Sequence, residues 1–173
     1  MSYSFALLDP RPTLDAEAAN NRTFADGPVL GIEVTIPALG RRCSLGNLDP
    51  QHTGGNASRA AIQEALECPL PPSGSVLVTV RPDLDAIGAM AILQLRASNT
   101  LIATEMTERV RRIAAADCFA HGPWPGPRPL PSENEADRDP AGEDLAAIAS
   151  LVADSGLSIS ERVDRMERRS EVH

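Results

Sequence analysis

The chain has 173 residues, of which 42% are hydrophobic and 3% aromatic, enough for one domain with an aliphatic, alanine-rich core. A net charge of −8 and a pI near 4.8 argue against a general nucleic-acid coat. All 16 basic residues are arginine, which excludes Schiff-base chemistry, a lysine base and a phosphate-loop lysine.

Three cysteines, Cys43, Cys68 and Cys118, are far apart and form no CxxC pair. This predicts reduced, structural thiols and a cytoplasmic protein. The longest apolar runs stay well short of the ~20 residues that a membrane-spanning helix needs, and the N-terminus lacks a charged-then-apolar signal. We therefore expect neither export nor a membrane partner.

The first informative segment is VLGIEVTIP, residues 29–37, which predicts a strand that ends at Pro37. Before it, a short helix is expected around residues 14–20. After it, Gly40 supplies a turn, and a second extended piece is expected over residues 42–45.

Residues 47–66 place polar side chains before a helix. A strand-like stretch leads to Asp49 and His52, and the helix is predicted to begin near residues 56–58 with Asn56 as its N-cap. Backbone N–H groups at Gly54 and Gly55 can face an anion there, although such a pair also suits an ordinary turn.

Residues 75–95 are central to the prediction. Residues 76–80 are β-branched and apolar, which indicates a strand buried on both faces, and Pro82 ends it. A helix follows at once, with Ile87, Ala91 and Leu95 at the i, i+4, i+8 spacing.

Two carboxylates, Asp83 and Asp85, lie between this strand and this helix. The turn after a parallel strand is where open α/β sheets bind ligands. Asp85 is expected to serve as N-cap or first-turn acid, whereas no local use is expected for Asp83. A divalent metal would offset the repulsion between the two carboxylates. The alternative is two turn residues that cap a helix.

A strong helix is predicted from Glu105 to Phe119, with an apolar stripe at Met106, Val110, Ile113 and Ala114. Asp117 and His121 continue that face toward the helix end. Because Asp117 and His121 continue a face that points to the core, their side chains are expected to point inward as a pair. If the helix ends earlier or is rotated at its end, they would face outward instead.

For the residues after this helix, the amino-acid composition is the main guide to structure. Gly122 to Pro131 holds five prolines and Trp124, which is expected to anchor an extended segment by packing or to cover a ligand. The fold class is α/β, a small mainly parallel sheet flanked by helices, with a C-terminal helical hairpin. The expected divisions are a core domain at residues 1–131, an acidic linker at 132–142 and the hairpin at 143–173, with a Ser158–Glu161 capping box.

The stretch RPDLDAIGA, between a strand and a helix, resembles the first motif of the DHH phosphoesterase superfamily. The resemblance implies that Asp83 and Asp85 bind manganese or another divalent metal and that Gly88 allows tight helix packing. The family usually has a histidine four residues before the first aspartate, where this chain has Thr79.

The segment LDPQHTGGNASRAAIQEAL is similar in kind to the motif that names the family, an Asp-His-His after a strand. It departs from that motif because Pro50 and Gln51 intervene and because it precedes Asp83. The implied metal ligands are Asp49, His52, Asp83, Asp85, Asp117 and His121. In this set, Asp117 and His121 supply the ligands that the motif lacks.

This set favours Mn²⁺ or Mg²⁺ as cofactor, with Asp83, Asp85 and His52 as the catalytic residues. Substrate phosphate would be held by Arg81, Arg59, Gly54, Gly55 and Asn56. For Arg81, a surface charge at a strand end is an equally good interpretation.

Two functions are therefore expected. The first is a metal-dependent phosphoesterase-like hydrolase acting on a small phosphate ester or nucleotide. The alternative is a non-catalytic metal- or nucleotide-binding protein on the same scaffold, with a homo-oligomer through the C-terminal helices.

Overall fold

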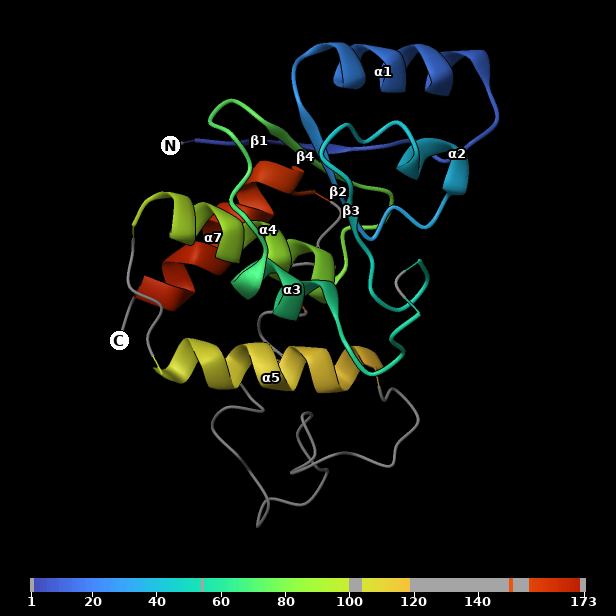
Figure 1. Cartoon of the computed structure of the whole chain (residues 1–173). Coiled ribbons are helices and arrows are strands. Elements are labelled where there is room, and N and C mark those ends of the chain that lie inside the picture. Colours follow the sequence, from blue (N-terminus) through green and yellow to red (C-terminus); the bar gives the residue numbers. More distant parts are fainter. Residues whose placement is uncertain (1, 54, 100–103, 119–149, 151–155, 172–173) are drawn as a thin grey trace.

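The computed structural model describes residues 2–53, 55–99, 104–118, 150 and 156–171, as shown in Figure 1. Its strands are β1 (Ser4–Leu7), β2 (Val29–Ile32), β3 (Asn47–Leu48) and β4 (Val76–Thr79). Its helices are α1 (Leu14–Ala25), α2 (Pro37–Gly40), α3 (Ala61–Glu67), α4 (Leu84–Ala97), α5 (Thr104–Cys118) and α7 (Ile159–Glu171).

The four strands form one sheet in the order β1-β4-β2-β3, and every pair is parallel. All residues of β2 and β4 are buried, as expected for strands covered on both faces. The predicted small parallel sheet and the α/β class are confirmed. Because all strands run the same way, their carboxyl ends meet at one edge of the sheet.

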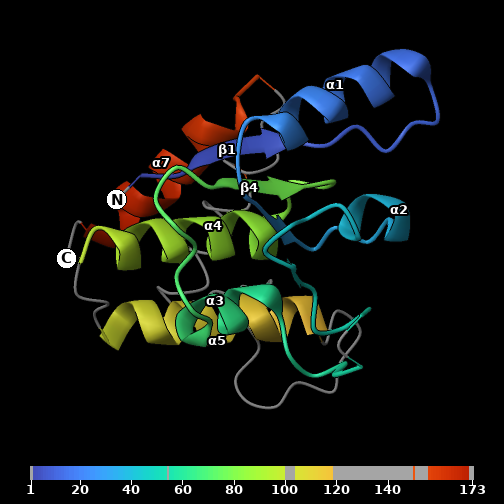
Figure 2. The same ribbon diagram turned by 45° about the horizontal axis from the view of Figure 1, so that its top comes forward.

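Helices cover both faces of this sheet (Figure 2). On one face, Phe24 and Leu39 pack with Val29, Val76 and Val78 in a small apolar cluster beneath α1 and α2. On the other face lie α4 and α7, and α3 and α5 pack beyond α4.

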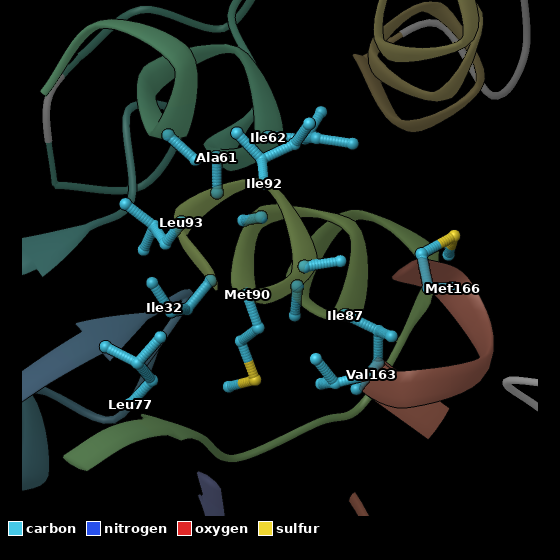
Figure 3. Close-up of a cluster of buried hydrophobic side chains, with 14 of the residues drawn as sticks. Ile32, Ala61, Ile62, Leu77, Ile87, Met90, Ile92, Leu93, Val163 and Met166 are labelled. Atoms are coloured by element: carbon cyan, nitrogen blue, oxygen red, sulfur yellow. The ribbon is translucent and has the colours of Figure 1, made fainter. Parts of the chain in front are cut away.

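Helix α4 is therefore enclosed on nearly all sides. Eleven of its 14 residues are buried, because its sequence is apolar all round rather than along one stripe. Met90 points toward Leu77 of the sheet, while Ile92 meets Ile62 of α3 (Figure 3). A Cβ at Gly88 would lie 2.5 Å from the Ile62 side chain, so glycine permits the close approach of α3.

Both ends of the short helix α3 are held by charged side chains of α4. Asp85, in the first turn of α4, accepts hydrogen bonds from the first backbone N–H groups of α3. Arg96, in the last turn, donates from Nη1 to the carbonyl oxygens of Ala65 (2.6 Å) and Cys68 (2.9 Å). Each charge has the sign that complements the adjacent end of the helix dipole.

The C-terminal helix α7 confirms the second half of the predicted hairpin. Glu161 accepts hydrogen bonds from the backbone N–H and hydroxyl of Ser158, and its own N–H bonds to Ser158 Oγ, which is the capping box. Val163 and Met166 pack into the same core as α4. The predicted first helix of the hairpin lies outside the described residues, apart from Ser150.

Three predicted elements differ from the structure. The strand after residue 29 ends at Ile32 and not at Pro37. Residues 42–45 form no strand: Pro37 starts the short helix α2, and the next strand is β3. Helix α3 begins at Ala61 rather than near Asn56, because its N-terminal cap comes from Asp85.

Other predictions lie outside the described residues: the Trp124 segment and the acidic linker. In the part of the chain that the structure describes, none of the helices has the length and apolar character needed to cross a membrane.

Candidate metal centre

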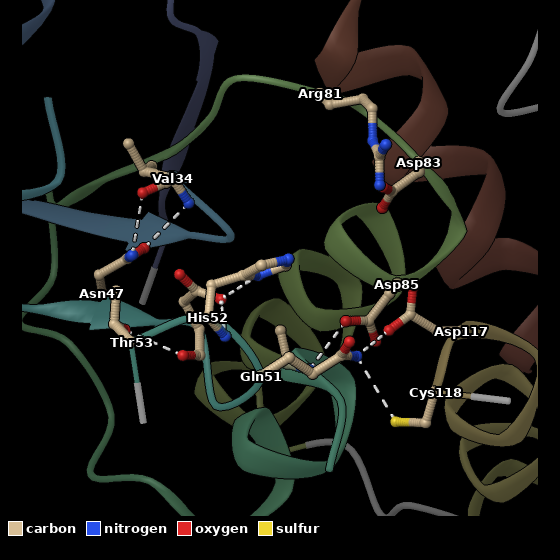
Figure 4. A network of polar contacts seen from close by, with 12 residues as sticks. Val34, Asn47, Gln51, His52, Thr53, Arg81, Asp83, Asp85, Asp117 and Cys118 are labelled. Carbon is tan, nitrogen blue, oxygen red and sulfur yellow. Dashed lines mark hydrogen bonds and ion pairs between the residues drawn. The ribbon is translucent and has the colours of Figure 1, made fainter. Parts of the chain in front are cut away.

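Acidic side chains gather where β2, β3 and β4 end. Glu33 follows β2, Asp49 follows β3, and Asp83 and Asp85 lie at the start of α4, directly after β4. Asp117 reaches the same place from the last turn of α5 (Figure 4). Carboxylates from separate segments thus share the edge at which parallel sheets bind ligands.

Three of these acids form a close trio. Glu33, Asp85 and Asp117 each place a carboxylate oxygen within 4.8 Å of the others. Glu33 and Asp85 are buried, at 7% and 1% exposure, and Asp117 is half-buried. Three carboxylates at this spacing, largely withdrawn from water, repel one another strongly unless protons or a cation neutralise them.

Burial raises the pKa of each member of the trio. For Glu33, burial and the charges of Asp85, Asp83 and Asp117 hold the pKa well above its usual range. Burial raises the pKa of Asp85 to about 7, although the hydrogen bonds that it accepts from the backbone N–H groups of Ile62 and Ala61 lower it. Burial also raises the pKa of Asp117, which the hydrogen bond from Gln51 opposes.

Glu33 reaches the trio through an unusual backbone conformation. Its φ is +50°, in the left-handed region that non-glycine residues rarely adopt. Its N–H still bonds to the carbonyl of Leu48 at 2.9 Å, but the strand goes no further. Its Oε2 is buried and has no hydrogen-bond partner, so the site contains a polar atom that the described residues leave unsatisfied.

Asp85 also caps the N-terminus of α3. Its Oδ2 accepts from the N–H of Ala61 at 2.8 Å, and its Oδ1 accepts from the N–H of Ile62 at 2.9 Å. These bonds cap α3 from a residue that is 24 positions further along the chain. They also fix the carboxylate plane that faces Asp117.

Asp83, not Asp85, is the N-cap of α4, which corrects the expectation that it has no local use. Its Oδ1 accepts from the N–H of Ala86 at 3.0 Å. Its Oδ2 pairs with Nε of Arg81 at 2.8 Å. Asp85 is the first-turn acid, as one form of the prediction had it.

An open hollow of about 190 Å³ lies beside the trio. It is lined by Glu33, Thr35, His52, Arg81 and Asp83. Arg81 is largely exposed, so much of its guanidinium faces water even while Nε is paired. The hollow therefore offers positive charge, an imidazole and a hydroxyl next to the acids.

His52 is oriented by a buried acid. Its Nδ1 lies 2.7 Å from Oδ1 of Asp49, which also accepts from the backbone N–H of His52. Asp49 is 2% exposed, and its Oδ2 has no hydrogen-bond partner among the residues that the structure describes. The pairing leaves Nε2 of His52 as the ring nitrogen available to a ligand.

Gln51 connects this loop to α5. Its Nε2 donates a short hydrogen bond to Oδ2 of Asp117 and lies 3.5 Å from Sγ of Cys118 (Figure 4). Burial and the nearby acids raise the pKa of Cys118 to about 11, so this thiol is protonated.

The structure brings most of the predicted residues together. Asp85 and Asp117 belong to the trio, Asp83, His52 and Arg81 line the hollow, and Asp49 lies behind His52. Their roles as ligands or catalytic groups remain predictions. His121 and Gly54 lie outside the described residues.

The remaining predicted phosphate ligands have other contacts. Arg59 pairs with Glu67 at the far end of α3. The N–H of Asn56 bonds to the carbonyl of Pro50, and its side chain accepts from Ser58. Gly55 is in the left-handed conformation with φ of +70°, as in a turn. None of these three residues lines the hollow.

Sequence reasoning missed Glu33, Thr35 and Gln51. A signal for Glu33 was present, because it is the lone charge in the apolar run VLGIEVTIP and directly follows the buried part of β2. In the sequence, Gln51 stands only as an intervening residue between Asp49 and His52. Nothing in the sequence pairs it with Asp117, which is 66 positions away.

The donor set determines which cation would suit the trio. Carboxylate oxygens are hard ligands, which favour Mg²⁺, Mn²⁺ or Ca²⁺ over softer metals. The unsatisfied Oε2 of Glu33 supports this interpretation independently of the crowding. Comparison with known proteins adds no relative, since no family model, no curated protein and no solved structure matches the chain.

Proposed function

We propose that the chain is a metal-dependent, phosphoesterase-like hydrolase acting on a small phosphate ester or nucleotide. The observation that carries the proposal is the trio of Glu33, Asp85 and Asp117, with carboxylate oxygens within 4.8 Å and one buried oxygen unsatisfied. A bound Mn²⁺ or Mg²⁺ would neutralise these carboxylates, polarise a phosphoryl oxygen and make water a stronger nucleophile.

The side chains around the hollow suit a phosphate group. Arg81 keeps N–H donors beyond the one that pairs with Asp83, and these can hold phosphoryl oxygens. Held by Asp49, His52 can accept or return a proton through Nε2. The low dielectric around the buried acids strengthens each of these interactions.

A second function has support of its own, a non-catalytic cation- or nucleotide-binding protein. Asp85 and Asp83 both cap helices, so each carboxylate has a structural reason to be where it is. In that case a cation would stabilise the packing of α3 and α5 around α4 without chemistry.

Hydrolysis of bis(4-nitrophenyl) phosphate in the presence of Mn²⁺ tests the proposal. We expect turnover that EDTA abolishes, and a loss on the order of 100-fold in kcat/KM for Glu33→Gln, which removes one ligand. Glu64→Gln, at a half-buried glutamate outside the trio, is the matched control and should retain activity.

The outcomes separate the two functions. Mn²⁺ binding that Glu33→Gln removes, without hydrolysis of this ester or of 4-nitrophenyl phosphate, would favour the binding protein. Failure of the wild-type chain to bind Mn²⁺ or Mg²⁺ would refute the hydrolase, and failure to bind a nucleotide as well would refute both functions.

The cytoplasm is the proposed compartment. All three cysteines are free thiols, and reduced thiols persist in the cytosol. The proposed partner is the small phosphorylated substrate itself. The apolar face of α7 packs on the chain's own core at Val163 and Met166.

A further inference from the structure

The conformation of Glu33 is held from outside the trio. The strand β2 ends at Ile32, and the chain then turns through Glu33 with φ of +50°. The left-handed conformation is unfavourable for a non-glycine residue, so surrounding contacts must enforce it. The contacts lie on the next residue, Val34.

Asn47, the first residue of β3, binds both backbone groups of Val34. Its Oδ1 accepts from the N–H of Val34 at 3.1 Å, and its Nδ2 donates to the carbonyl of Val34 at 3.2 Å (Figure 4). These two bonds take the place of the strand pairing that Val34 would otherwise make. They fix the chain on the C-terminal side of Glu33, while Leu48 fixes its N–H.

Gly31 leaves the space that the Asn47 side chain occupies. A Cβ at Gly31 would lie 2.5 Å from Oδ1 of Asn47 and 3.0 Å from Sγ of Cys43. The amide of Asn47 therefore lies against a strand position that admits no side chain. The contacts among Gly31, Asn47 and Val34 together fix the backbone next to Glu33 and so direct its side chain toward the trio.

We propose that Asn47 is a positioning residue that builds the cation site by locking Glu33 in its left-handed conformation. The expected effect of Asn47 on metal affinity rests on the cation site proposed above. Its expected effect on the backbone conformation of Glu33 does not depend on any metal. Asn47 lies outside the trio and does not line the hollow, so its effect passes through Val34 and the Glu33 backbone.

The chain contains a matched control for this residue. Asn20 makes the same two-bond contact with Asp9 beyond β1: Oδ1 accepts from the N–H of Asp9 at 2.9 Å, and Nδ2 donates to its carbonyl at 2.8 Å. Both asparagines hold a residue that lies two positions past a strand end. Asn20 belongs to α1, which covers the opposite face of the sheet from α4 and α5, the helices that carry Asp85 and Asp117 (Figure 2).

The experiment compares Asn47→Ala with Asn20→Ala in the full chain. We expect similar falls in melting temperature, since each variant loses two equivalent hydrogen bonds. Mn²⁺ affinity, measured by calorimetry, should fall 10- to 100-fold in Asn47→Ala only. The strong intraresidue HN–Hα NOE of Glu33, a marker of positive φ, should weaken in Asn47→Ala and keep its intensity in Asn20→Ala.

Gly31→Ala provides a second route to the same result, because its methyl group displaces the Asn47 amide without removing any polar group. It should weaken Mn²⁺ binding and the Glu33 NOE as Asn47→Ala does. Unchanged affinity together with a retained Glu33 NOE in a folded Asn47→Ala would overturn the proposal. If wild-type protein binds no Mn²⁺, the cation site falls, and the NOE comparison alone decides whether Asn47 sets the conformation.

Discussion

Asp85→Asn should lower the free energy of unfolding by about 2 kcal/mol, and Asp85→Ala by about 3 kcal/mol or more. The carboxylate accepts one N–H of α3 on each oxygen. An amide offers a single acceptor, so its NH₂ group would face the second N–H donor. Alanine leaves both buried donors unsatisfied next to a cavity.

Urea unfolding at pH 8 tests this effect, because Asp85 has a pKa of about 7 and its carboxylate is ionised there. Asp83→Asn is the control on the same helix, since asparagine is an equally good N-cap and should cost only a few tenths of a kcal/mol. Hydrogen exchange should accelerate at Ala61 and Ile62 in the Asp85 variants. Equal stability of Asp85→Asn and wild type would contradict the capping role.

The metal-free protein should lose stability as the pH rises from 5 to 8. The folded-state pKa of Asp85 is about 7, against a reference value of 3.8, so the folded state binds the proton more tightly than the unfolded state. Stability is therefore greatest below the unfolded pKa and declines through pH 7. About three pKa units correspond to roughly 4 kcal/mol as an upper estimate. Glu33 and Asp117 shift in the same direction.

Mn²⁺ should reverse this loss, because a cation that binds only the folded state at 100 times its Kd adds about 2.7 kcal/mol. Melting temperatures with EDTA and with Mn²⁺ across this pH range make the measurement. In Glu33→Gln, the EDTA curve should be flatter and the response to Mn²⁺ should vanish. A wild-type curve in EDTA that stays level from pH 5 to 8 would argue against a crowded acidic trio.

The central part of the fold was predictable because its signals are local. The apolar run of β4, the proline after it and the largely apolar helix α4 lie within 22 consecutive residues. The approach of Asp117 to Asp85 followed from two local patterns, an acid after a strand and an acid at the end of an apolar helical stripe. Sheet topology then placed both at one edge.

What escaped prediction depends on contacts between distant residues. The local pattern predicts that α3 starts near Asn56, whereas it starts at Ala61, where Asp85 supplies the cap. The run VLGIEVTIP predicts a strand through Glu33, but Glu33 has a left-handed backbone, and the next residue, Val34, is bound by Asn47, 13 positions further along the chain. The pattern of residues 42–45 predicts an extended piece, although the chain has already turned at α2.

Because α4 binds both ends of α3, through Asp85 and Arg96, the two helices must form in a particular order. A seven-residue helix is too short to persist alone, and both of its electrostatic anchors, Asp85 and Arg96, are synthesised after it. A nascent chain that stops short of residue 85 carries the complete α3 sequence without either anchor. We expect α3 to form late, only once β4 and α4 have docked, and the acidic trio cannot be assembled before that moment.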